Sequence, residues 1–321
     1  MEDIDMNDKR KIVLVGTGFV GMSMAYSFLN TGGINELVLV DVNHEKAVGE
    51  AMDLQHGLPY ARGKMDIRAG GYEECKDASI VVITAGVAQK EGETRLELTS
   101  RNAKIMKSVV EQVCASGFAG IFVIASNPVD SMTYLAQKVS GFPKEKVIGS
   151  GTILDTARLR YLMSEYLQVS SSNVHAYMMG EHGDSSFVPW THASIGAKNL
   201  LAYLDEKDKD LVDLHNIYTQ VQQAAYEIIS RKKSTYYGIG LSLNRLIHAI
   251  LDDEDVILTV SVYQDGEYGE KGLYIGVPAI IHRQGVREIV KLDLNEVDQG
   301  KFRYSCDTLR HINEIIIDPM L

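Results

Sequence analysis

The sequence predicts an α/β protein in which a doubly wound parallel sheet is followed by a second, mixed α/β domain. Three observations support this fold class. Short apolar runs alternate with amphipathic stretches through the first half of the chain, a glycine-rich loop follows the first run, and the pattern changes after residue 149. Short apolar runs are typical of strands buried on both faces, and their alternation with helical stretches places helices on both sides of a parallel sheet.

The elements follow one another in a regular order. The first half contains expected strands at residues 12–15, 37–40, 80–83, 121–124 and 147–149. Helical stretches lie between them, up to about residue 30 and at about 96–115. In the second half, amphipathic stretches at about 155–167 and 208–230 surround expected strands at 256–263 and 272–277. Because no low-complexity linker separates the halves, we expect domains 10–149 and 150–321 to meet at a change of pattern.

The composition is that of a protein with a substantial core. Of the 321 residues, 45% are hydrophobic and 23% are charged, and the formal net charge is −11. Such a charge disfavours nucleic acid or an anionic membrane as a partner, since both would be repelled at long range. It does not disfavour a small anion held by a few arginines inside a cleft, where salt screens charges weakly.

The cysteines and the first residues of the sequence indicate in which cellular compartment we expect the protein. Cys75, Cys114 and Cys306 lie far apart, without a CxxC pair, so neither a disulfide framework nor a metal site is signalled. The first ten residues are acidic and polar, and no apolar run approaches the ~18 residues of a membrane span. We therefore expect a cytoplasmic protein without a metal and without a membrane partner.

The sequence GTGFVG at residues 16–21 follows the first expected strand and opens the first helix. A GxGxxG loop in this setting can bind a pyrophosphate, because its glycines allow a tight turn and close approach while the helix N-terminus supplies N–H donors. Asp41 ends the second strand, where its carboxylate can accept hydrogen bonds from ribose hydroxyls and would repel a ribose phosphate. Together these features predict a Rossmann-type NAD site; a glycine turn with a capping aspartate is the alternative. The loop residues expected at the cofactor are Gly16, Gly18, Phe19, Val20 and Gly21.

Two further motifs carry titratable or charged side chains. GEHGD at residues 180–184 places His182 between glycines, which favours a ring held in an exposed turn, and histidine titrates near neutral pH. Asp155 and Arg158 lie three residues apart in LDTAR and so share one face of a helix. They could face one cleft, or form a surface ion pair of little energetic value.

Two loops follow strands at the carboxyl edge of the sheet, where open α/β folds bind ligands. Residues 86–95 have glycines near both ends and a polar centre, which suits a lid that closes over a ligand, although an ordinary solvated loop has the same composition. SNPVD at residues 126–130 follows the next strand and offers Asn127 as an amide group beside the cofactor.

Taken together, GTGFVG, Asp41, AQKEGETR, SNPVD, LDTAR and GEHGD, in this order, closely resemble the L-lactate dehydrogenase branch of the lactate/malate dehydrogenase family. The resemblance runs from about residue 11 to the C-terminus. It implies reversible hydride transfer between NADH and pyruvate, giving L-lactate, as in the final step of anaerobic glycolysis. The first domain would bind NAD, and the second would be the substrate-binding and catalytic domain.

The resemblance also assigns roles. It implies that His182 donates a proton to the pyruvate carbonyl, with Asp155 as its orienting carboxylate. Arg158 would hold the substrate carboxylate through a two-pronged contact that lysine could not reproduce. Arg95 would polarise the carbonyl when the lid closes, and Asn127 would hydrogen-bond the carbonyl or its catalytic neighbours.

Other residues concern the choice of substrate and the contact with the cofactor. Gln89 stands where malate dehydrogenases of this pattern carry an arginine, so the resemblance implies that oxaloacetate, with its second carboxylate, is rejected. Thr235 would lie beside the substrate side chain, and Ile239 would pack on the nicotinamide. Glu91 departs from the family pattern, where proline is frequent, which implies at most a change in lid flexibility.

Arg160 and His175 match positions that line a fructose 1,6-bisphosphate site at a subunit interface in bacterial members. Two cationic groups suit a phosphate, although purely local contacts would explain them as well. Activation by this ligand would imply a homotetramer whose interface the activator stabilises.

Three other functions stay open. A dehydrogenase of another 2-hydroxy acid, malate or a branched-chain acid, would differ only in the pocket. An NAD-dependent glycosidase would need a metal bound by cysteine and histidine near the nicotinamide, and no such pair accompanies Asn127. A noncatalytic NAD-binding protein would not need His182, Asp155, Arg158 and Arg95 together.

Overall fold

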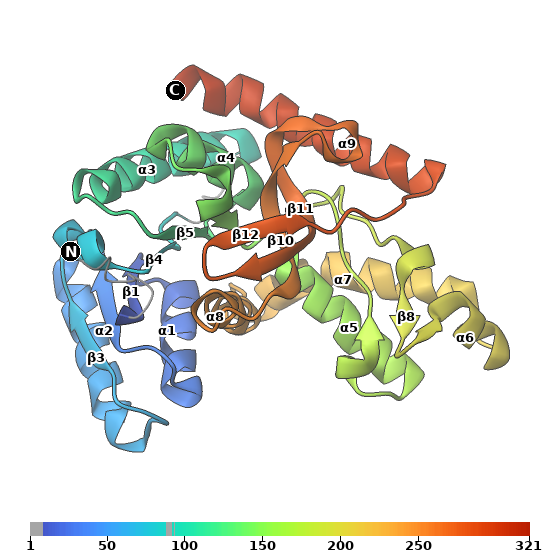
Figure 1. The fold of residues 1–321 in the computed structure, drawn as a ribbon, viewed down its shortest axis with the longest axis horizontal. Helices are drawn as coiled ribbons and strands as arrows, with labels where there is room; N and C mark the ends of the chain where they lie inside the picture. Colours follow the sequence, from blue (N-terminus) through green and yellow to red (C-terminus); the bar gives the residue numbers. More distant parts are fainter. Residues whose placement is uncertain (1–8, 88–91, 93) are drawn as a thin grey trace.

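The computed structural model describes residues 9–87, 92 and 94–321, with their side chains except that of Arg95. Among these residues, one nine-stranded sheet runs through the molecule, with helices on both faces (Figure 1). The strand order is β12-β11-β10-β6-β5-β4-β1-β2-β3. The strands are β1 (Lys11–Val15), β2 (Glu36–Val40), β3 (Asp66–Ala69), β4 (Ile80–Ile83), β5 (Ile121–Ile124), β6 (Val147–Gly149), β10 (Val256–Asp265), β11 (Lys271–His282) and β12 (Gly285–Ile289).

Strands β1 to β6 are parallel and form the doubly wound part that the sequence predicts. Alternate residues of β1 explain why its whole run is apolar: Ile12 and Leu14 belong to the core on one face, and Val13 belongs to the core on the other. The helices are α1 (Phe19–Thr31), α2 (His44–Gly57), α3 (Arg95–Ala115), α4 (Val129–Ser140), α5 (Ile153–Leu167), α6 (Leu200–Glu206), α7 (Leu211–Lys232), α8 (Tyr237–Leu251) and α9 (Glu296–Ile312).

The main sheet does not stop where the parallel pattern ends. Strand β10 pairs antiparallel with β6, Ser261 lying opposite Gly149, and β11 and β12 continue the sheet as antiparallel strands. Glycine is required at 149 because a Cβ there would collide with the Thr133 hydroxyl and the Ser261 side chain. The two halves of the chain therefore share one sheet, which the sequence did not indicate.

The second half also has a core of its own. Helices α5, α6 and α7 pack around a small sheet of β7 (Val174–His175), β8 (Ser194–Ile195) and β9 (Lys198–Asn199). Leu159, Met163, Leu200 and Leu214 are buried in this cluster, at 3% exposure or less. Helix α5 thus has one face in this core and its first turn next to the main sheet, and that first turn carries Asp155.

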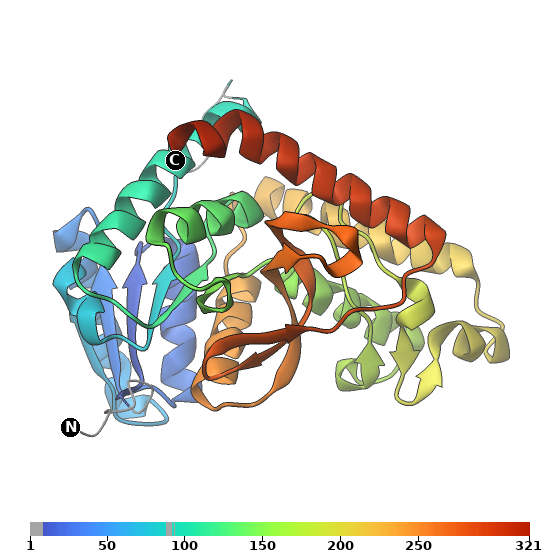
Figure 2. The ribbon, with the colours of Figure 1, turned by 45° about the horizontal axis from the view of Figure 1, so that its top comes forward.

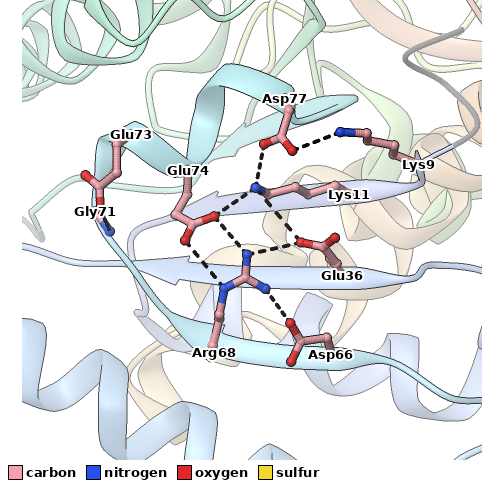
Figure 3. Close-up of polar contacts among 9 residues, drawn as sticks. All are labelled: Lys9, Lys11, Glu36, Asp66, Arg68, Gly71, Glu73, Glu74 and Asp77. Carbon is pink, nitrogen blue, oxygen red and sulfur yellow. Dashed lines mark hydrogen bonds and ion pairs between the residues drawn. The ribbon is translucent and has the colours of Figure 1, made fainter. Parts of the chain in front are cut away.

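Charged side chains occupy the amino ends of β1, β2 and β3 (Figure 3). Lys11 is only 3% exposed, and its Nζ lies 2.6 Å from Asp77 Oδ1 and 2.8 Å from Glu74 Oε2. Arg68 bonds Glu74 at 2.8 Å and Glu36 at 3.1 Å. Burial by itself lowers the pKa of Lys11, but Asp77 and Glu74 raise it above its ordinary value. The ammonium group therefore stays charged inside a ring of carboxylates.

The C-terminal helix α9, red in Figure 2, runs along one side of the molecule from the second half back towards α3. Phe302, Cys306 and Leu309 are buried on its inner face, and the Lys107 ammonium donates to the carbonyl of Met320 at 2.5 Å. Within the part of the chain that the structure describes, no helix is both long and apolar enough to cross a membrane.

Candidate active site

The segment 180–184 presents His182 at the carboxyl edge of the sheet. Gly180 pairs with Gly276 of β11 through two backbone hydrogen bonds of 2.9 and 3.0 Å. Its φ of +100° is a conformation that only glycine adopts without strain, and a Cβ there would lie 2.6 Å from the Ser305 hydroxyl. The imidazole that follows is 29% exposed, so it reaches an open space while its loop is fixed.

Asp155 joins His182 to Arg158. Its Oδ2 lies 2.6 Å from His182 Nδ1, and its Oδ1 accepts from Arg158 Nη1 at 2.9 Å. The Asp155 and Arg158 side chains are only 11% and 14% exposed, so the alternative of a surface ion pair is wrong. Because Nδ1 faces Asp155, the other ring nitrogen, Nε2, is the one available to exchange a proton with a ligand.

Burial and charge act in opposite directions on these groups. Burial by itself raises the pKa of Asp155, but the charges and hydrogen bonds of His182 and Arg158 lower it below its usual range. Burial by itself lowers the pKa of His182, but Asp155 raises it above the ordinary histidine value. The arrangement favours an imidazolium paired with a carboxylate.

A cavity of about 300 Å³ lies beside this pair. It brings together Asn127, Asp155, Arg158 and His182, as the sequence led us to expect. Its described lining residues are Leu98, Thr99, Asn127, Pro128, Asp155, Arg158, Met178, His182, Gly183, Asp184, Ser186, Val221, Gln222, Ala225, Tyr226 and Ile229. A space whose described lining combines an arginine, a proton-transfer group and apolar side chains suits a small carboxylate with a carbonyl or hydroxyl group.

The glycine loop fits the diphosphate of a dinucleotide. Gly16 has φ +103° and sits against the backbone of Ala85, so it makes the tight turn. A Cβ on Gly21 would collide with the carbonyl of Gly16, so glycine is needed for helix and strand to pack. Gly18 faces open space and caps α1 without a side chain, leaving backbone N–H groups for an anion. Phe19 and Val20 open the helix, and Phe19 is 70% exposed.

Asp41 lies beside this loop at the end of β2. Its Oδ2 accepts from both the backbone N–H and the hydroxyl of Thr17, at 2.8 Å each, and its Oδ1 accepts from the Asn43 N–H at 2.9 Å. Burial raises the pKa of Asp41, but these bonds and the charge of Lys46 lower it below the usual range. An ionised carboxylate at this position fits the ribose hydroxyls of NAD.

Several expected residues are not placed in the cavity. Gln89 lies outside the described residues, as do the other loop residues 88, 90, 91 and 93, and of Arg95 the structure gives only the position at the start of α3. Thr235 is half-buried between α7 and α8 and is not among the described residues that line the cavity. Ile239 is half-buried in α8 and packs against the main core.

Arg160 lies on α5 and His175 on β7, and Arg160 contacts the two residues that follow His175. The Arg160 Nε donates to the Ala176 carbonyl at 3.1 Å, and its guanidinium lies 5.1 Å from the centre of the Tyr177 ring. Burial lowers the pKa of Arg160 from its ordinary value. His175 is exposed on the edge of the small sheet. Arg160 is therefore engaged by the chain directly after His175.

Helix α7 contributes a wall of the cavity that the sequence did not identify. Val221, Ala225 and Ile229 are spaced four apart, so they lie on one face of the helix, and all three line the cavity. That spacing was visible in the sequence, but it reads equally as ordinary core packing. Among the described residues, no group of three histidine, cysteine, aspartate or glutamate side chains is arranged to hold a metal.

Two family models match this chain, one after the other along the sequence. The NAD binding domain of lactate/malate dehydrogenase matches residues 10–149, and the alpha/beta C-terminal domain of lactate/malate dehydrogenase matches residues 152–318. Together these matches cover nearly the whole chain.

Individual relatives agree with the family models. The chain is 54% identical over 301 residues to L-lactate dehydrogenase 2 of Bacillus cereus, covering 94% of this chain and 96% of that protein. The crystal structure of a lactate dehydrogenase from a Medee basin deep-sea metagenome library superposes with a TM-score of 0.94 at 54% identity, covering 95% of this chain and 98% of that chain. The crystal structure of the ligand-bound minor L-lactate dehydrogenase of Enterococcus mundtii also superposes with a TM-score of 0.94. It is 48% identical and covers 96% of this chain and 98% of that chain. The chain therefore belongs to the lactate/malate dehydrogenase family, within its L-lactate dehydrogenase branch.

Proposed function

We propose that this protein interconverts pyruvate and L-lactate, with His182 as the group that gives and takes the proton. The observation that carries the proposal is the 2.6 Å contact between His182 Nδ1 and Asp155 Oδ2 at the wall of the cavity. Residues 10–149 would serve as the NAD-binding domain and residues 150–321 as the substrate-binding and catalytic domain. The three cysteines are free, which fits an enzyme in a reducing compartment such as the cytoplasm.

The bound nicotinamide supplies the hydride for pyruvate reduction and accepts it when lactate is oxidised. His182 donates the Nε2 proton to the oxygen that becomes the lactate hydroxyl, and accepts it again in the reverse direction. Asp155 holds Nδ1, so it fixes the orientation of the ring and stabilises the imidazolium form. This division of labour requires His182 to be protonated before pyruvate binds, which agrees with its raised pKa.

Arg158 is proposed to bind the substrate carboxylate. One of its donors, Nη1, is used by Asp155, and the rest of the guanidinium borders the cavity. A planar guanidinium can hold a carboxylate through two parallel hydrogen bonds, which fixes the angle at which the carbonyl meets the nicotinamide. Asn127, at the same wall, would hydrogen-bond the carbonyl or its neighbours.

We assign the choice among 2-oxo acids to the loop 86–95 and to the segment that joins α7 to the first turn of α8. Gln89 would reject oxaloacetate because a neutral amide leaves the second carboxylate unpaired. Arg95 would polarise the carbonyl on closure, Thr235 would border the substrate side chain, and Ile239 would pack on the nicotinamide. A malate or branched-chain 2-hydroxy acid is the alternative substrate.

A regulatory site is proposed at Arg160 and His175. The bond from Arg160 to the residue after His175 supports a phosphate-binding site for fructose 1,6-bisphosphate, and a homotetramer would place two copies of the pair across an interface. Arg160→Gln should abolish stimulation by this ligand and leave the unstimulated rate unchanged. Sedimentation with and without the ligand would test the assembly.

The test of the main function has two parts. NADH oxidation by the purified protein is measured with pyruvate and oxaloacetate in parallel, and pyruvate should be strongly preferred. His182→Gln should then retain NADH binding, measured by fluorescence, while losing turnover. Near-normal turnover in this variant would exclude His182 as the proton donor, and preference for oxaloacetate would favour the malate alternative.

A further inference from the structure

A second carboxylate, Asp130 of α4, touches the backbone of the catalytic loop, whereas Asp155 contacts the His182 ring. Asp130 is 2% exposed. Its Oδ2 accepts from the backbone N–H of His182 at 2.8 Å, and its Oδ1 accepts from the Ser261 hydroxyl of β10 at 2.5 Å. Both oxygens are therefore engaged by ordered donors. The proton transfer described above makes no use of this group.

Two further attachments of the loop backbone are neutral. The Ser305 hydroxyl of α9 accepts from the Glu181 N–H at 3.1 Å and donates to the Ser185 carbonyl at 2.7 Å. Gly180 pairs with Gly276, as described above. Compared with the contacts made by Ser305 and Gly276, the contact made by Asp130 comes from an ionisable group. It also reaches the backbone of His182 itself. Helix α4 also begins directly after Asn127 and Pro128, so one segment both lines the cavity and holds the catalytic residue.

We propose that Asp130 is a positioning residue for proton transfer: its carboxylate, oriented by Ser261, holds the main chain of His182 and adds a second negative charge behind the imidazole. This inference rests on the proposed role of His182 as proton donor. Asp155 would then orient the ring from its side chain, while Asp130 fixes the point from which the side chain starts. Neither function can replace the other, because one acts at Nδ1 and the other at the backbone.

The charged groups around the imidazole determine how the pKa of His182 should respond when Asp130 is replaced. Asp155 and Arg158 face it from α5, Asp130 from α4, and Glu181 lies next to it on its own loop. The two aspartates raise the pKa of His182, and Arg158 lowers it. Burial raises the pKa of Asp130 to about 6, although the bonds from Ser261 and His182 favour ionisation. At neutral pH Asp130 is therefore mostly charged.

Glu181 adds a negative charge near Asp130 and raises the pKa of that carboxyl, while the other groups named here are neutral. Cys306 of α9 is buried near Asp130, and burial raises the pKa of its thiol, so it stays protonated. Ser261 and Ser305 contribute hydroxyls. Removing the Asp130 charge should therefore be felt mainly at His182.

Asp130→Asn is the decisive variant because it keeps the shape and removes the charge. The amide oxygen can accept from the His182 N–H, and the amide nitrogen can donate to the Ser261 oxygen, so the loop keeps its attachments. The pH midpoint of kcat/KM for pyruvate reduction should fall by about one unit, because the imidazolium loses a nearby negative charge. The rate at neutral pH should fall on the order of 10-fold.

Ser305→Ala is the matched control, since it removes a neutral attachment of the same loop. It should lower kcat through a looser loop and leave the pH midpoint in place. If Asp130→Asn and Ser305→Ala lower the rate equally, with the midpoint unmoved in both, Asp130 is a purely structural contact and the proposal is wrong. If Asp130→Asn fails to fold, Ser261→Ala replaces it: loss of the donor makes Asp130 harder to ionise, so the midpoint should move the same way by less, and an unmoved midpoint overturns the proposal.

A measurement without turnover separates this inference from the proposed function. The imidazole of His182 is titrated by NMR, its signal being identified by its absence in His182→Gln. A lower His182 pKa in Asp130→Asn supports the proposal even if another 2-oxo acid is the true substrate, and an unchanged pKa overturns it even if pyruvate is turned over.

Discussion

Two clusters of buried charge lie at opposite edges of the same sheet, and they are built differently. At the amino edge, Lys11 and Arg68 are each surrounded by carboxylates, and the dashed contacts of both cations in Figure 3 all go to carboxylates of the protein. At the carboxyl edge, Asp155 contacts Nδ1 of His182 and accepts a hydrogen bond from Nη1 of Arg158. His182 and Arg158 also line a cavity. A closed network stabilises the fold, whereas one left open towards a cavity can bind and react.

The comparison separates stability from activity, because each cluster should control one of them. Substitutions at the amino edge should change the free energy of unfolding and leave kcat and KM in place. Substitutions at the carboxyl edge should do the reverse. Each variant below is therefore measured both by steady-state NADH oxidation and by urea unfolding.

Asp155→Asn should have the largest effect. The amide leaves the imidazolium without its counter-charge and can favour the wrong tautomer, so kcat should fall on the order of 10³-fold. The His182 pKa should fall as well, since Asp155 is what raises it most. A variant that keeps more than about a tenth of the activity would contradict the assignment of Asp155 as the orienting carboxylate.

Arg158→Lys tests whether the open side of the cluster binds the substrate. Lysine keeps the charge next to Asp155 but cannot form two parallel bonds to a carboxylate, so KM for pyruvate should rise about 100-fold or more. Arg68→Lys is the matched control at the closed network and should leave KM unchanged. Equal KM values in the two variants would place the substrate carboxylate elsewhere.

Lys11→Met tests the closed network. Removing the buried central cation leaves the partly exposed carboxylates of Asp77 and Glu74 without their shared partner, and the free energy of unfolding should fall by about 2 to 4 kcal/mol. The lower end is expected because Asp77 is 44% exposed and water screens its charge. A loss of kcat in the folded variant would mean that the two edges are coupled through β1.

Acid should weaken the closed network by protonating its carboxylates. Hydrogen bonds from Lys11 hold the pKa of Asp77 and of Glu74 below their ordinary values. Because their folded pKa values are depressed, these groups stabilise the fold fully above about pH 4 and lose that contribution as pH falls through the lowered values. Lys11→Met should therefore show a flatter fall in melting temperature below about pH 4 than the unsubstituted protein, and parallel curves would contradict this.

The sequence was most informative where one local pattern decides the structure. The continuous apolar runs predicted β1, β2, β4, β5 and β6, and GTGFVG with Asp41 predicted the NAD domain, which the family match confirms. His182, Asp155, Arg158 and Asn127 were proposed from motifs, and the structure brings all four to one cavity.

The sequence alone thus determined the Rossmann domain, the family and the residue types available for proton transfer and carboxylate binding, because strand periodicity and glycine turns are local properties. Only the tertiary structure decided that Asp155 and Arg158 are buried, that β10–β12 extend the parallel sheet, and that Asp130 and Ser261 meet behind His182. The physical reason is distance along the chain: Asp130 and Ser261 are separated by 131 residues. Such contacts form when whole elements pack, and no local pattern specifies which side chains will then face each other.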